Sequence, residues 1–187
     1  DHSLILALNC DGGALWDTFF WYVSGKWEWI PLYLLILWLI YRRTGWRAML
    51  LALGFMAAGV VVGDQIANFF KSEHAGWLSW LTPRLRPSHT LGLQESIHTV
   101  RGYAGGLYGT VSAHAATAFC IAVFSACALR SRLFTALILL WTLLVCYSRI
   151  YLGVHFPLDL LYGAVDGTLM GLLGFWGWRA VRKRFAL

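Results

Sequence analysis

Long apolar runs are the feature of this sequence that most limits the folds open to it. Four runs approach the roughly 20 apolar residues that a membrane-spanning helix needs. They are residues 47–70, 112–129, 133–151 and 157–178. A fifth run, residues 29–41, is shorter, and Pro31 suits the start of a helix there. Of the 187 residues, 59% are hydrophobic and only 13% are charged, more apolar surface than a soluble domain of this length buries. We therefore predict an all-α integral membrane bundle of five or six transmembrane helices.

The N-terminal segment decides between five and six spans. Asp11 and Asp17 stand among aromatic residues there, which favours an interfacial helix and leaves a sixth span open. The first residues lack the basic region of a cleavable signal peptide. No linker-like stretch divides the chain, so we expect one membrane domain over residues 1–187. The four cysteines show no CxxC spacing and are expected to be buried thiols. Nothing in the sequence indicates an oligomeric state.

Basic residues gather at the ends of the apolar runs and orient the predicted bundle. With five spans, three groups fall on one side: Arg42, Arg43 and Arg47; Arg130 and Arg132; Arg179, Arg182, Lys183 and Arg184. This excess of Arg and Lys predicts that the side is cytoplasmic. The histidines, with Lys71, Arg86 and Arg149, fall on the other side or at its boundary. We therefore assign the net charge of +6 to membrane anchoring, with the lipid bilayer as partner and no nucleic acid.

Three short segments on that other side combine cations, histidines and a carboxylate. They are "RLRPSH" (84–89), "GGLYGTVSAHAA" (105–116) and "YSRIYLGVHFPLD" (147–159). Each has an ordinary structural interpretation: an arginine that reaches lipid headgroups, a serine that caps a helix, an aspartate in a first turn. Together they favour a phosphate site, because arginines, a lysine and a helix N-terminus all bind a tetrahedral oxyanion.

Two histidines in these segments supply the other groups that phosphoryl transfer needs. One suits a nucleophile and the other a proton donor in a two-step reaction. Asp159 follows His155 by four residues, so its carboxylate can orient the imidazole and stabilise it as a cation. The remaining polar residues of the outer loop, His74, His89, His98, Glu73 and Glu95, lack the spacing of a metal site, and we expect no metal.

The third segment also resembles a known family signature. "SRIYLGVHFPLD" matches, at every defining position, the third signature of the type 2 phosphatidic acid phosphatase superfamily. That superfamily includes membrane lipid phosphatases and has a site similar to that of vanadium haloperoxidases. Arg86–Pro87 and "VSAH" at 111–114 resemble its first and second signatures in degraded form. The first signature places Lys seven residues before Arg, where this chain has Ser79, so Lys71 is the expected counterpart through an insertion.

The resemblance implies a role for each matching residue. His155 would attack phosphorus and form a phosphohistidine, while Asp159 orients the ring. His114 would protonate the departing oxygen and then activate water. The implied phosphate-binding residues are Lys71, Arg86, Ser112, Ala113 through its backbone, and Arg149. These cations take the part that a metal plays in many phosphoryl-transfer sites, so no cofactor is expected.

The expected function is therefore hydrolysis of a lipid phosphate or diphosphate monoester. Undecaprenyl diphosphate, phosphatidylglycerol phosphate, phosphatidic acid and lipid A phosphates are candidates that the sequence does not separate. A phosphotransferase using the same site and a non-catalytic lipid-phosphate receptor or transporter stay open as alternatives. The charge pattern and compact size favour a bacterial inner membrane, with the site facing the periplasm.

Overall fold

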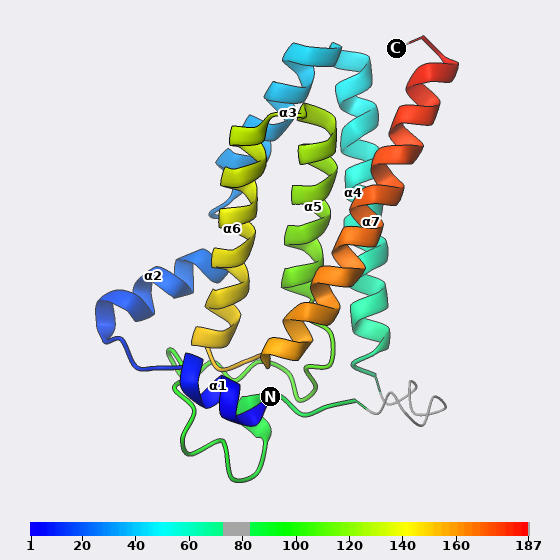
Figure 1. Ribbon diagram of the computed structural model, residues 1–187. Helices are drawn as coiled ribbons and strands as arrows, with labels where there is room; N and C mark the ends of the chain where they lie inside the picture. Colours follow the sequence, from blue (N-terminus) through cyan, green and yellow to red (C-terminus); the bar gives the residue numbers. More distant parts are fainter. Residues whose placement is uncertain (73–82, 187) are drawn as a thin grey trace.

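In the computed structural model, which describes residues 1–72 and 83–186, every regular element is helical, and one isolated β-bridge pairs Leu85 with Tyr108. The elements are α1 (His2–Leu8), α2 (Ala14–Ser24), α3 (Ile30–Thr44), α4 (Trp46–Phe69), the short 3₁₀ helix η2 (Pro87–His89), α5 (Ala113–Leu129), α6 (Arg132–Tyr151) and α7 (Pro157–Arg184). Helices α3 to α7 form an upright bundle, and α1 and α2 lie at the end where α6 finishes and α7 begins (Figure 1). The all-α membrane bundle predicted from the sequence is confirmed.

Helix length separates three candidate membrane spans from the shorter helices. Within the described residues, α4, α6 and α7 are long and apolar enough to cross a membrane, with 24, 20 and 28 residues. Helix α5 has 17 residues and α3 has 15. At about 1.5 Å per residue, α3 covers roughly 22 Å of a hydrocarbon core about 30 Å thick. Helix α2, with 11 residues, is too short to be a sixth span, which favours the interfacial interpretation of the N-terminal segment.

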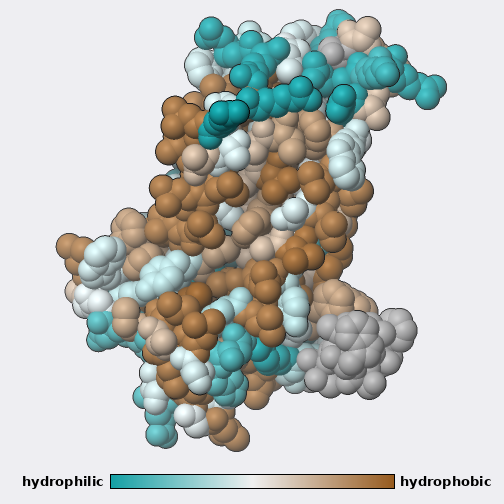
Figure 2. Space-filling view, in the orientation of Figure 1, coloured by the Kyte–Doolittle hydropathy of each residue, from teal (hydrophilic) through white to brown (hydrophobic). Residues whose placement is uncertain are grey.

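The bundle end away from α1 carries the predicted basic groups. Arg130 ends α5 in the left-handed conformation (φ 46°), and Arg43 of α3 donates a hydrogen bond to the carbonyl of Leu129 beside it. The last turns of α3 and α7 hold Arg42, Arg43, Arg182, Lys183 and Arg184. Figure 2 shows hydrophilic residues covering this end and apolar residues along the bundle below it. This distribution is what a bundle anchored by cations at one membrane face requires.

Helix α7 packs directly against the backbone of α5. A Cβ on Gly167 would lie 2.1 Å from the carbonyl oxygen of Ala116, and one on Gly163 would lie 2.4 Å from that of Ser112. Small residues allow such close approach between membrane helices. The backbone N–H of Ser112 donates to the carbonyl of Asp159 at 3.0 Å, which fixes the start of α5 against the start of α7. The second and third sequence segments are thereby held side by side.

Residues 83–112 fold over this end of the bundle and are tied to it by Asn9. The Asn9 amide donates to the carbonyls of His98, Ile150 and Tyr151 at 3.1, 2.9 and 2.9 Å, and its oxygen accepts from the His98 N–H at 2.7 Å. Asn9 itself is 8% exposed. One buried side chain therefore joins the N-terminal segment, the long loop and the end of α6.

Candidate active site

His155 lies in the short connection between α6 and α7, buried with 1% of its surface exposed. Its Nδ1 is 3.3 Å from Asp159 Oδ2, and its Nε2 is 3.4 Å from Arg86 Nη1. Burial lowers the pKa of His155 to about 3, against the opposing effect of the Asp159 hydrogen bond. The imidazole is therefore neutral at physiological pH. With its proton on Nδ1 facing the carboxylate, it presents the Nε2 lone pair toward the arginine, as a nucleophile must.

Asp159 stands in the first turn of α7 and is fully buried. Its Oδ2 accepts from the Phe156 N–H at 2.9 Å as well as facing His155, and its Oδ1 is bound by the Arg84 guanidinium. Arg84 also pairs with the carboxylate of Asp1 and lies 4.4 Å above the Phe156 ring. The carboxylate that orients His155 is itself held on both oxygens.

Arg86 is 9% exposed and fixed from two directions. Its Nε donates to the carbonyl of Tyr108 and its Nη1 to that of Val154, both at 3.1 Å. Burial, with the charge of Arg149, lowers the pKa of the Arg86 guanidinium from its usual value. An arginine stays protonated under such conditions, so the structure holds a buried cation beside the proposed nucleophile.

Arg149 lies in the last turn of α6 with 3% of its surface exposed. Its Nη1 donates to the Ser24 hydroxyl, and its guanidinium lies 5.9 Å from the centre of the Tyr103 ring. Within the described part of the chain, Arg149 Nε is buried and has no hydrogen-bond partner. A buried N–H donor without a partner is costly, and a bound anion would satisfy it.

The start of α5 contributes Ser112, Ala113 and His114. Ser112 is fully buried, and its hydroxyl caps the helix by accepting from the Ala115 N–H at 3.4 Å. Its own N–H is taken by the Asp159 carbonyl, so this N–H is not available to a phosphate. His114 is an electrostatic neighbour of Arg149 and His155. The charge of His155 acts on His114, so the two histidines lie near each other, and the Ser112 hydroxyl caps α5 while it can still donate its own proton to a ligand.

Lys71 follows the end of α4, and its surroundings connect it to the same site. Burial, with the charge of Arg86, lowers the pKa of Lys71 to about 8, and Arg149 and Asp159 are among its electrostatic neighbours. The insertion that the sequence predicts between Lys71 and Arg86 falls largely in residues 73–82, which lie outside the described residues. Glu73 and His74, two of the polar residues considered above for a metal site, lie there as well.

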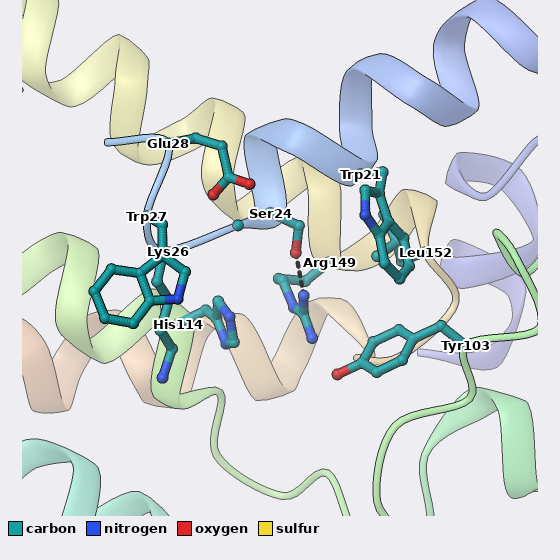
Figure 3. Close-up of a pocket in the computed structure, with 10 residues that line it drawn as sticks. Trp21, Ser24, Lys26, Trp27, Glu28, Tyr103, His114, Arg149 and Leu152 are labelled. Carbon is teal, nitrogen blue, oxygen red and sulfur yellow. Dashed lines mark hydrogen bonds between the residues drawn. The ribbon is translucent and has the colours of Figure 1, made fainter. Parts of the chain in front are cut away.

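A cavity of about 260 Å³ opens beside His114 and Arg149. Figure 3 shows these two side chains in its centre, with Lys26 and Trp27 toward one side and Trp21 and Tyr103 toward the other. The remaining lining residues are Ser24, Gly25, Glu28 and Leu152. The positive charge of Lys26 acts on the His114 imidazole. The cavity therefore lets a ligand reach the proposed acid and one of the two buried arginines.

Sequence reasoning gave no role to Arg84, Lys26 or Glu28. Arg84 was visible in "RLRPSH", but only the fold shows that it binds Asp159, 75 positions away. Lys26 and Glu28 are charged residues in the aromatic stretch "GKWEW" (25–29), which was the available signal. Charged residues at the boundary of an apolar run reach the membrane interface at little cost, so this signal alone did not mark a site.

Among the described residues, one group of side chains could hold a metal ion: Asp11, Asp17 and His98. Their ligand atoms lie within 4.8 Å of one another. Their contacts favour a structural role. Asp17 Oδ1 accepts from the Tyr151 hydroxyl at 2.7 Å and lies 2.8 Å from His98 Nε2. The Tyr151 hydrogen bond lowers the pKa of Asp17. This network joins α2 to the end of α6 and to the long loop, without reaching His155 or His114.

The chain is similar to two lipid A 4'-phosphatases. It is 35% identical to that of Bacteroides thetaiotaomicron over 179 residues, which cover 95% of this chain and 74% of the relative. It is 33% identical to that of Porphyromonas gingivalis over 172 residues, covering 91% and 70%. A family model described as "PAP2 superfamily" matches residues 66–184, the range that holds every proposed catalytic and phosphate-binding residue.

A solved structure has the same fold. The crystal structure of Aquifex aeolicus LpxE superposes with a TM-score of 0.65 and covers 93% of both chains. At 22% identity, this likeness extends to the fold alone.

Proposed function

The chain belongs to the PAP2 superfamily, and from that premise we propose that it is a membrane phosphatase that hydrolyses a lipid phosphate through a phosphohistidine on His155. The observation that carries the proposal is a buried His155 whose two ring nitrogens face Asp159 and Arg86, near a buried Arg149 whose Nε has no partner among the described residues. Mere binding of a phosphate needs the cations but not His155 held by Asp159.

In the first step, His155 Nε2 attacks phosphorus as the bond from phosphorus to the lipid oxygen breaks. His114, which must be protonated when the anionic phosphate is bound, gives that proton to the departing oxygen, so the lipid leaves as an alcohol. Arg86 and Arg149 stabilise the negative charge on the phosphoryl oxygens, and each such preorganised donor contributes about 3–4 kcal/mol. Asp159 stabilises the cationic ring of the phosphohistidine through Nδ1.

In the second step, water replaces His155 on phosphorus. His114, now neutral, takes the proton of the attacking water, and the bond from phosphorus to Nε2 breaks to release inorganic phosphate. The electron pair of that bond returns to Nε2, which restores the neutral imidazole that burial favours. Atoms and charge balance over the cycle, with one lipid phosphate and one water consumed.

The favoured substrate is a phosphate of lipid A or a similar lipid, a choice supported by the names of the two relatives. The favoured location is the bacterial inner membrane, with the site on the outer face. Support for this sidedness comes from the basic residues at the opposite end of the bundle. The headgroup of such a lipid would reach His114 and Arg149 through the cavity that these two residues line.

The test is phosphate release by the purified protein in detergent, with chelator present. The panel contains lipid A, phosphatidic acid, phosphatidylglycerol phosphate and undecaprenyl diphosphate. We expect release with lipid A that His155→Ala abolishes and that His89→Ala, in a different outer segment, retains. Acid-labile phosphate trapped on His155 would support the intermediate. No release from any lipid by folded protein would contradict the proposal, and phosphate moved to an acceptor hydroxyl without release would make the protein a phosphotransferase.

A further inference from the structure

Glu28 occupies an unexpected position for a site that binds only phosphate. Its side chain lines the same cavity as His114 and Arg149 (Figure 3). The carboxylate folds back against Gly25, where an added Cβ would lie 1.9 Å from Glu28 Oε2. In the described residues, Glu28 has no ion pair with a lysine or arginine. A free carboxylate repels a phosphate but accepts hydrogen bonds from hydroxyl or amide groups, so the cavity suits a ligand that carries both kinds of group.

Aromatic faces complete this cavity. Trp27 is 80% exposed, more than any other tryptophan among the residues that the structure describes. Trp21 stands on the other side of Arg149, held edge-on against Tyr103 at 5.8 Å and covered by the Arg101 guanidinium at 5.0 Å. The cavity wall at Trp21 is thus held in place by its neighbours, whereas the wall at Trp27 is exposed. Ligand sites of this kind combine aromatic surfaces with a few polar groups that set orientation.

We propose that residues 25–29 recognise a sugar ring that carries the scissile phosphate, with Glu28 accepting hydrogen bonds from ring substituents and Trp27 packing on the ring face. The inference rests on the proposed function, because it assigns the leaving group of the same reaction. A pyranose has one flat apolar face and several hydroxyl donors, which match a tryptophan and a carboxylate. A glycerol phosphate has neither a ring to stack nor, when both other hydroxyls are acylated, a donor for Glu28.

An interfacial anchor is the competing explanation for this segment. Tryptophans collect at the membrane–water boundary whether or not they touch a ligand. The two explanations differ in what the loss of a side chain does. An anchor affects every lipid substrate alike, whereas a recognition residue affects the substrate whose headgroup it contacts.

The experiment measures kcat/KM for two lipids with matched acyl chains: a glycolipid with one phosphate on its sugar ring, and phosphatidic acid. We expect Glu28→Ala and Trp27→Ala each to lower the ratio of glycolipid to phosphatidic acid activity about tenfold or more. Each variant removes a hydrogen bond or a stacking contact that only the glycolipid makes. Glu28→Gln, which keeps an acceptor oxygen, should restore part of that ratio. Trp46→Ala, at the other end of the bundle, is the matched control. Because the ratio is taken within one preparation, partial unfolding of a variant does not change it.

Each outcome separates this inference from the proposed function. A wild-type protein that hydrolyses neither lipid contradicts the proposed function. A wild-type protein that hydrolyses both, with the ratio unchanged in Glu28→Ala and Trp27→Ala, overturns the inference alone. Preference of the wild type for phosphatidic acid overturns it as well, while a lipid phosphatase remains.

Discussion

Replacing Gly167 with alanine tests whether the contact between α5 and α7 sets the geometry of the site. The new Cβ would lie 2.1 Å from the carbonyl oxygen of Ala116 and 2.8 Å from its carbonyl carbon. Carbon and oxygen atoms in contact lie about 3.3 Å apart, so the helices must separate by about 1.2 Å. Both contacted atoms are backbone, which cannot rotate away. A misplacement of about 1 Å between reacting groups costs about a hundredfold in rate. We expect Gly167→Ala to lower kcat by about that factor.

The assay combines phosphate release with thermal unfolding in the same detergent. Overpacking should lower the free energy of unfolding by about 1–3 kcal/mol, so rates are measured well below the melting temperature. Gly54→Ala on α4 is the matched control, because its added Cβ has no atom within 4 Å beyond its chain neighbours and the backbone of its own helix. The control should keep full activity and gain about 0.5–1 kcal/mol from the better helix former. A folded Gly167→Ala protein with the activity of Gly54→Ala would refute the reasoning.

Three further predictions concern charge, positioning and stability. Because the pKa of Lys71 is lowered to about 8, its ammonium loses its proton as the pH rises through that value, and kcat/KM should fall there. Lys71→Arg keeps the cation and should move the fall upward by at least about one pH unit. Arg84→Ala frees one oxygen of Asp159 and should lower kcat about tenfold with little change in KM, and Arg84→Lys should recover part of the loss. Trp178→Phe removes the 2.8 Å hydrogen bond to the Ala48 carbonyl, so the free energy of unfolding should fall by about 1 kcal/mol with kcat unchanged.

Each of these three has an outcome that would count against it. A pH–rate profile of Lys71→Arg identical to that of the wild type would remove Lys71 from phosphate binding. Equal kinetics of Arg84→Ala and wild type would reduce the Arg84 contact to a surface ion pair. A large loss of kcat in Trp178→Phe would mean that the far end of α7 controls the site.

Local patterns in the sequence predicted the bundle and the centre of the site. The apolar runs were long enough to locate α4, α6 and α7, whose bounds differ by a few residues from the predicted runs. His155 and Asp159 are four positions apart, so their contact needed only one local turn, and the structure contains it. The family resemblance, carried by the same short segment, is confirmed by the match over residues 66–184. The catalytic and phosphate-binding roles stay predictions.

Contacts between distant segments could not be predicted in the same way. Arg149 meets Ser24 from 125 positions away, and Arg84 meets Asp159 from 75. No periodicity or spacing encodes such pairs, since they depend on how α2 and the long loop fold over the bundle. Ser112 shows a different limit: its position fitted both a helix cap and a phosphate ligand, and the cap that the structure contains leaves the hydroxyl proton able to serve a ligand, so the two roles do not exclude each other.

The backbone contact between α5 and α7 divides the molecule into a part that must be conserved in shape and a part that is free to change. His114, His155 and Asp159 are placed by helices whose separation glycines fix. Residues 25–29 connect α2 to α3 and take no part in that contact. We expect that exchanging these five residues with those of a relative transfers its choice of lipid while leaving the chemistry intact. Selectivity in this architecture would then evolve, or be engineered, as a replaceable module.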